Sequence, residues 1–409
     1  MTRAVALSLT SMTGSLQQSP RTLTLVTQVS GLLLFGIALE RSFTAFERWL
    51  PRDIYFEPSF TLALFSAVPL LLLPAFLALA PAPLSFLPAR TIRADTLGWN
   101  NADSIGGLRW CAFCVVVALC WSQAAYPYNY YYGQAHVLDR WLLVLLALGT
   151  LRSPLLIPLF LFEFMISRGQ LRHPVNSLAP ITEELPIRLL CIIAGLALWN
   201  LVVSSQRFAN WSERVRRENR ETTSLRIPTH VLVYALLCLL GSYYGYAGIA
   251  KLTIGESLLD WAQSSHMENL FVGAYLNGWP LVDSQESLLS LAKVVRNLSV
   301  PIASATILLE CGMILVLVHR LGTIVLVGSI FMMHLGIVAM TGIFFWQWVV
   351  VDVSLTIWLW WVRNDETIGS IYSTRNAVAS VFLIATLILA FGVNRFTWWN
   401  TKWYSVLEV

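Results

Sequence analysis

The feature that most constrains this chain is a series of apolar runs, several of them near the length of about 20 residues that a helix needs to cross a membrane. Of its 409 residues, 56% are hydrophobic and only 12% are charged. The runs do not show the alternation of apolar and polar residues that is typical of membrane barrels. We therefore expect an all-α fold, a polytopic helical bundle embedded in membrane lipids.

The apolar runs predict nine or ten transmembrane helices. Their expected ranges are 23–39, 60–80, 108–125, 141–166, 185–206, 229–252, 298–318, 321–343, 345–362 and 377–393. The run at 141–166 leaves the count open, because Arg152, Pro154 and Pro158 can split it into two half-length helices or kink it.

We expect the membrane domain to cover residues 22–394, with a short segment on either side of it. Residues 1–21 carry basic and hydroxyl side chains without acids, which indicates a disordered tail or, as an alternative, an organellar transit segment. Residues 395–409 form a short C-terminal tail, whose tryptophans are typical of the membrane–water interface.

The distribution of charge in the loops predicts sidedness. Residues 207–226 contain six arginines between two apolar runs, which places this loop in the cytoplasm. Residues 254–297 then form an extracytoplasmic insertion, in which acidic residues outnumber basic ones, and the C-terminus lies on the same side. The net charge of +4 is explained by loop arginines, so we expect no nucleic acid as a partner.

Four apolar runs each supply one ionisable residue at membrane depth: Lys251, Glu310, His334 and Asp352. Such residues are costly in a membrane and normally face the bundle interior. They can be buried ion pairs that fix helix register, or Lys251 can snorkel to the interface. If they converge, an apolar environment favours the neutral amine of Lys251, which is a base, while Glu310 or His334 orients it or relays a proton.

The surroundings of Lys251 favour burial over exposure to lipid. Lys251 follows Tyr243 and Ala247 at helical spacings, so the three share a face. Three glycines on the same run, Gly241, Gly245 and Gly248, allow a neighbouring helix to approach closely.

Two further motifs each have a structural and a functional interpretation. Cys111 and Cys114 form a C-x-x-C pair that could exchange electrons with a quinone or a thiol, although cysteines on a helix are commonly apolar fillers. No second Cys or His cluster accompanies them, so we expect no metal. The segment "AAYPYNYYYGQAHVLDRW" provides interfacial tyrosines, or an aromatic entrance for a flat lipid-soluble ligand with Asn129 or His136 as polar contacts.

The ordered set of motifs resembles a known family. The stretch "YAGIAKL" followed by Trp261, then Glu310 in "LLECGMIL", then "HLGIVAMTGIFFW" is similar in order and spacing to the HTTM family over roughly residues 20–362. The best-known branch of that family is the vitamin K-dependent gamma-carboxylase.

The resemblance implies a helical membrane enzyme in which the lysine matching Lys251 deprotonates reduced vitamin K or a related hydroquinone. Oxygen then adds, and the basic alkoxide takes a proton from a glutamate side-chain carbon, which captures carbon dioxide while the quinone becomes an epoxide. It implies Lys251 as the base, with Glu310 and His334 as polar neighbours in the site. The residues expected to contact the cofactor are Tyr243, Tyr246, Asn129, Tyr130, His136 and Trp261.

Two departures from the family pattern limit this carry-over. The Asn-His pair of the carboxylase corresponds here to Asn129-Tyr130, with His136 displaced. A large extracytoplasmic domain that holds a protein substrate is absent from the sequence, so we expect a small or peptidic substrate. Two alternatives of other classes stay open: a non-catalytic membrane partner in maturation, and a proton-coupled transporter that uses Glu310, His334 and Asp352.

Overall fold

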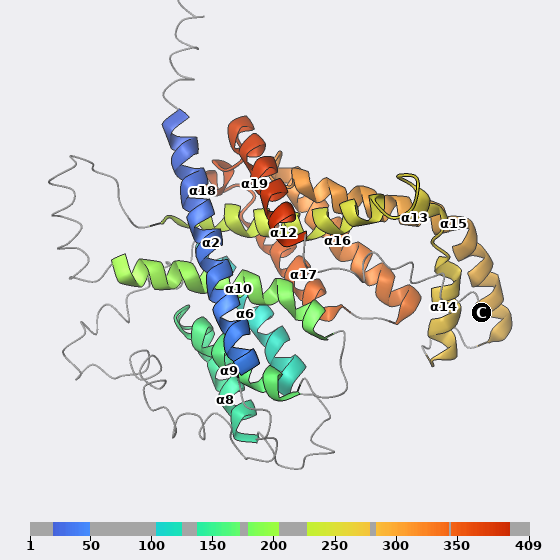
Figure 1. Cartoon of the computed structure of the whole chain (residues 1–409), viewed down its shortest axis with the longest axis horizontal. Helices are drawn as coiled ribbons and strands as arrows, with labels where there is room; N and C mark the ends of the chain where they lie inside the picture. The colour runs from blue at the N-terminus through green and yellow to red at the C-terminus, as the bar shows by residue number, and fades with distance from the viewer. Residues whose placement is uncertain are drawn as a thin grey trace, which may run out of the picture.

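The computed structural model describes residues 19–49, 104–124, 137–171, 179–203, 227–278, 284–342 and 345–392. These residues form helices and turns without a strand, which confirms the all-helical prediction (Figure 1). The longer helices are α2 (Ser19–Trp49), α6 (Ser104–Ala124), α8 (Val137–Thr150), α9 (Leu156–Leu171), α10 (Ala179–Val203), α12 (Thr229–Leu252), α14 (Met267–Leu276), α15 (Gln285–Gly312), α16 (Arg320–Thr341), α17 (Trp346–Trp361) and α19 (Thr374–Gly392). Three short elements complete the set: α13 (Asp260–Gln263), η2 (Met313–Leu315) and α18 (Glu366–Gly369).

Five of the described helices are long and apolar enough to cross a membrane: Leu23–Glu47, Glu183–Val203, Thr229–Leu252, Gln285–Leu315 and Arg320–Thr341. The segments Gly107–Gln123 and Thr374–Ala390 are apolar but shorter. A membrane protein with several crossings is thus supported, whereas the count of nine or ten stays a prediction. The run at 60–80 and the arginine-rich loop at 207–226 lie outside the described residues.

The interrupted run at 141–166 is two helices, α8 and α9, which pack against each other. They are 14 and 16 residues long, so each covers only about 21–24 Å at the helical rise, less than the hydrocarbon core. Pro154 lies in the turn between them, while Pro158 falls in the first turn of α9, where a missing N–H costs little. This outcome is the split that the sequence left open.

Helix α12 lies at the centre of the bundle and contacts α2, α10, α15 and α19 (Figure 1). In its most apolar stretch 83% of the residues are buried. Its glycines permit this packing: a Cβ on Gly241 would stand 2.7 Å from the carbonyl oxygen of Met313, and one on Gly248 would stand 2.8 Å from the backbone nitrogen of Cys311. The predicted close neighbour of α12 is therefore the end of α15 together with η2.

The segment between α12 and the membrane part of α15 is folded into helices. We name its described residues, 254–278 and 284–300, the arm, which contains α13, α14 and the first half of α15. Its residues share a small apolar core with Ala303 and Ile307 of α15. Helix α15 begins at Gln285, before the predicted start of the seventh span at 298, and the Ser284 side chain accepts a hydrogen bond from the backbone N–H of Ser287 there.

Candidate functional site

The first centre of the site is an ion pair between Lys251 and Glu310. Nζ of Lys251 lies 2.7 Å from Oε1 and 2.6 Å from Oε2 of Glu310, so one amine contacts both carboxylate oxygens. Lys251 is 5% exposed and Glu310 is 3% exposed. The snorkelling alternative for Lys251 is therefore wrong, because its amine points into the protein and not to water.

Local packing explains why this pair forms. Lys251 is in the last turn of α12 and Glu310 is in the last turns of α15, and these helices pack along each other. Gly248, one turn before Lys251, allows the close approach, since a Cβ there would lie 3.0 Å from Cβ of Glu310. The ring of Trp261, from α13 of the arm, covers the amine with its centre 5.2 Å from Nζ.

The second centre joins His334 of α16, Asp352 of α17 and Tyr244 of α12. The Tyr244 hydroxyl donates to Oδ2 of Asp352 at 2.8 Å, and Nδ1 of His334 contacts the same oxygen at 3.0 Å. With its proton on Nδ1, His334 is the second donor to that carboxylate. The arrangement leaves Nε2 of His334 as a nitrogen that can accept a proton.

Aromatic side chains surround His334. The ring centres of Trp348, Tyr244 and Phe345 lie 5.7, 5.8 and 6.2 Å from that of the imidazole. Asp352 is fully buried, and its Oδ1 has no hydrogen-bond partner among the described residues. A buried acceptor of this kind is uncommon, which marks the second centre as a candidate for chemistry as well as structure.

The structure thus brings together the four ionisable residues that the sequence singled out, in two pairs. Lys251 meets Glu310, and His334 meets Asp352. Tyr244 links the second centre to α12, the helix that also carries Lys251, because its hydroxyl donates to Asp352. Sequence reasoning missed Tyr244 and chose its neighbour Tyr243.

Tyr243 points elsewhere. Its ring lies under the guanidinium of Arg188 on α10, 5.3 Å away, and against Trp348, with ring centres 6.3 Å apart. Tyr246 is partly buried and Trp261 is buried beside Lys251. The other residues expected to contact a cofactor, Asn129, Tyr130 and His136, lie outside the described residues.

The C-x-x-C pair forms no disulfide. Cys111 is buried on the continuous helix α6 and donates its S–H to the backbone oxygen of Ser354 on α17 at 3.0 Å. Cys114 is exposed on the same helix. This geometry favours the apolar-filler interpretation of the two cysteines.

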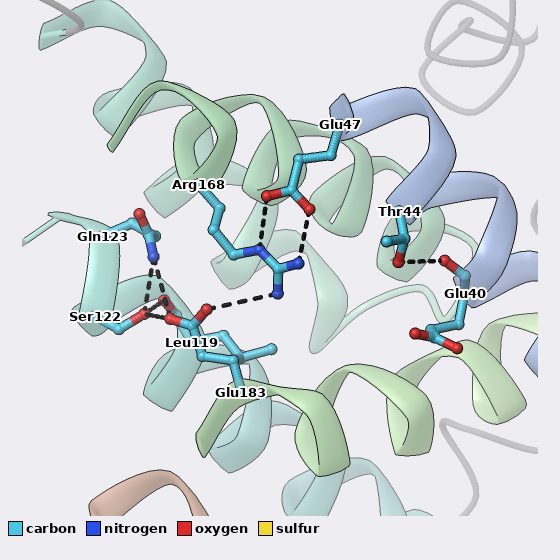
Figure 2. A network of polar contacts seen from close by, with 8 residues as sticks. All are labelled: Glu40, Thr44, Glu47, Leu119, Ser122, Gln123, Arg168 and Glu183. Atoms are coloured by element: carbon cyan, nitrogen blue, oxygen red, sulfur yellow. Dashed lines mark hydrogen bonds and ion pairs between the residues drawn. The ribbon is translucent and has the colours of Figure 1, made fainter. Parts of the chain in front are cut away.

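A second polar cluster, which the sequence did not single out, lies between α2, α6, α9 and α10 (Figure 2). Nε and Nη2 of Arg168 contact the two carboxylate oxygens of Glu47 at 3.0 and 2.6 Å. Nη1 of Arg168 lies 3.7 Å from Glu183, which also accepts hydrogen bonds from Ser122 and Gln123. All three charged residues are buried.

Arg188 extends this arginine cluster toward α12. It binds Glu40 of α2 at 3.3 Å and Glu184 one turn before it on α10, and its guanidinium stacks on Tyr243. The signal that could have located the cluster is the position of Glu47, Arg168 and Arg188 at or near the ends of apolar runs. Such positions are also normal for exposed charges, so the sequence alone did not distinguish them.

Within the described residues no group of three or more His, Cys, Asp or Glu side chains could hold a metal ion. No protein-family model, curated protein or solved structure matches the chain.

Proposed function

We propose that the chain is an integral membrane enzyme in which Lys251 is the general base and Glu310 its proton partner. The proposed reaction uses a reduced quinone-like cofactor to modify a small or peptidic substrate on the side of the membrane where α12 ends. The observation that carries the proposal is the buried contact of Lys251 with both oxygens of Glu310. The resemblance of this region to the HTTM family supports the same assignment.

The choice of lysine at this position favours chemistry over simple pairing. The chain contains three lysines, at positions 251, 293 and 402, and 24 arginines. An arginine is always protonated in proteins and would satisfy a carboxylate with better geometry, whereas a buried lysine can release its proton. A lysine in a buried pair therefore keeps an acid–base function that an arginine would remove.

The pair can become a base without separating its residues. Transfer of one proton from Nζ to Glu310, across 2.6 Å, gives a neutral amine beside a neutral carboxylic acid. An apolar environment favours this exchange because it removes two charges at once. The amine can then accept a proton from a bound hydroxyl group, and Glu310 holds the first proton.

The residues near the pair fit the cofactor class. A reduced quinone, when bound, supplies an acidic hydroxyl group and the electrons for reaction with oxygen. Trp261 offers an aromatic face at the amine, and apolar side chains of α12 and α15 line the same region. Glutamate carboxylation coupled to quinol epoxidation is the reaction that the family resemblance implies for such a site.

The test is a quinol-oxidation assay on the purified chain in lipid nanodiscs, with vitamin K hydroquinone as the probe and epoxide measured by chromatography. We expect Lys251→Ala and Lys251→Arg to lower the rate by about 10²-fold or more, because neither side chain provides a base. Lys293→Ala, at an exposed lysine of the arm, is the matched control. Equal rates in the parent chain and Lys251→Arg would remove the base assignment.

The second centre favours one other candidate, a proton-coupled transporter. Tyr244, Asp352 and His334 form a buried hydrogen-bonded chain across three helices, as proton relays in transporters do. Transport predicts a proton flux in liposomes that is lost in His334→Asn and Glu310→Gln. If the chain is the proposed enzyme instead, we expect epoxide formation without such a flux.

A further inference from the structure

A row of apolar side chains runs along the exposed side of the arm. Leu291, Val294 and Leu298 follow one another on α15 at spacings of three and four, so they form one stripe. They are 42%, 52% and 46% exposed. The side of the helix that packs on α14 is different: it carries Leu288 and Ser299, which are buried.

This stripe continues without a break into the part of α15 that is expected in the membrane. Pro301, Ala305 and Leu308 follow at the same spacings and are also exposed, Leu308 at 73%. In a transmembrane helix, an exposed apolar stripe faces lipid. Continuity of the stripe indicates that lipid also covers its first half.

Polar residues gather on an adjoining side of the same half-helix. Glu286, Ser290, Lys293 and Asn297 are exposed and follow each other at spacings of three and four, with one exposed leucine, Leu289, beside them. A helix with one mainly apolar and one mainly polar exposed side is typical of an element that lies in the membrane interface.

The length of the helix agrees with this position. The apolar segment Gln285–Leu315 has 31 residues, which corresponds to about 46 Å of straight helix against a hydrocarbon core of about 30 Å. Pro301 stands inside the helix, where a bend can redirect it. Figure 1 shows α14 beside α15 at the edge of the molecule.

We propose that the arm lies on the bilayer surface, with Leu291, Val294 and Leu298 in the boundary between head groups and acyl chains. The contact is mainly apolar, because acidic residues of the arm outnumber its two basic residues, Lys293 and Arg296. Trp261, whose ring covers the amine of Lys251, belongs to the same arm. Contact of the arm with the bilayer would therefore also hold Trp261 at the lipid boundary. It does not depend on the enzymatic role of Lys251.

The test uses nitroxide labels on the full chain in phosphatidylcholine nanodiscs. Single cysteines are placed at Leu291 and Val294, with Glu286 and Ser290 as matched controls on the mainly polar side. The background carries Cys114→Ser and Cys311→Ser, since the other four native cysteines are buried. All four label sites are exposed, so labelling leaves the fold intact; far-ultraviolet circular dichroism checks this.

We expect collisions with oxygen to exceed collisions with a water-soluble nickel chelate by several-fold at Leu291 and Val294, and the reverse at Glu286 and Ser290. Raising the salt concentration should leave this pattern unchanged, since apolar burial does not depend on charge. Chelate access at all four sites would overturn the proposal. Protection of Leu291 and Val294 from both reagents would also overturn it, because protein and not lipid would then cover the stripe.

Discussion

The two buried polar regions of this protein pair their carboxylates with different basic side chains, and this difference suggests a structural role for one region and a chemical role for the other. The arginine cluster joins α2, α6, α9 and α10 through Arg168 and Arg188. The two centres at α12 and α15–α17 use Lys251 and His334. Arginine holds carboxylates in a fixed geometry and keeps its proton, whereas lysine and histidine can exchange theirs. We therefore expect a structural role for the first region and propose proton transfer for the second.

The largest expected effect comes from replacing each whole pair by apolar residues. Lys251→Met with Glu310→Leu should lower quinol oxidation by about 10²–10⁴-fold, because it removes a general base. Arg168→Met with Glu47→Leu should leave the rate within a few-fold of the parent chain. The measurement is the epoxide assay at matched amounts of folded protein. Equal losses in the two double variants would erase the distinction between the regions.

Removal of one partner should affect stability in both regions alike. Glu310→Ala removes the carboxylate that contacts the buried amine of Lys251, and Glu47→Ala removes the closer of two carboxylates beside Arg168, the other being Glu183 at 3.7 Å. Each should lower the free energy of unfolding by about 3–5 kcal/mol, the usual result of breaking a buried pair. Denaturant unfolding in micelles gives the values. The double variants should recover most of the loss, and a failure to recover would indicate an additional role for the charges in folding.

At the second centre, a chemical role can be distinguished from a packing role by a substitution that keeps one nitrogen of His334 and removes the other. His334→Asn keeps a donor for Asp352 but lacks the Nε2 base, so stability should change by about 1 kcal/mol while the activity falls. Tyr244→Phe should cost about 1.5–3 kcal/mol, since it removes a hydrogen bond to a charged group. Unfolding and activity are measured together. Full activity of His334→Asn would restrict this centre to a structural role.

The smallest expected effect tests the C-x-x-C pair. Cys111→Ala removes one weak S–H donor and a little volume, so the free energy of unfolding should fall by about 1 kcal/mol and the activity should stay unchanged. Cys114→Ala, at the exposed position, should change neither. A loss of activity in either variant, with the fold intact, would instead support the redox interpretation.

Much of the second region was predictable from the sequence. Lys251, Glu310, His334 and Asp352 each interrupt an apolar run, and the cost of burying a charge points to them individually. Their pairing was not predictable, because it depends on which helices become neighbours. Tyr243 and Tyr244 show the same limit: they are about 100° apart on α12, and only the positions of Arg188 and Asp352 decide which one joins a centre.

The fold was predicted better in its helices than in its connections. The predicted apolar runs within the described residues are helical, although the run at 141–166 is two helices and the run at 298–318 extends past the end of α15 into η2, because apolar length is a strong signal. The polar first turns of α15 were not predicted to be helical, because Glu286, Lys293 and Arg296 are also typical of a loop. In the structure Ser284 caps a helix that begins before them. The arginine cluster was missed because its members stand at the ends of runs.

The order of the helices along the chain has a consequence for biogenesis. Lys251 and Glu310 are on α12 and α15, which only the short helices α13 and α14 separate in the chain, and His334 and Asp352 are on the consecutive helices α16 and α17. During synthesis each pair can meet as a hairpin and enter the lipid with its charges already matched. Arg168 and Glu47, by contrast, are 121 positions apart, so this pair can form only after α9 has been synthesised.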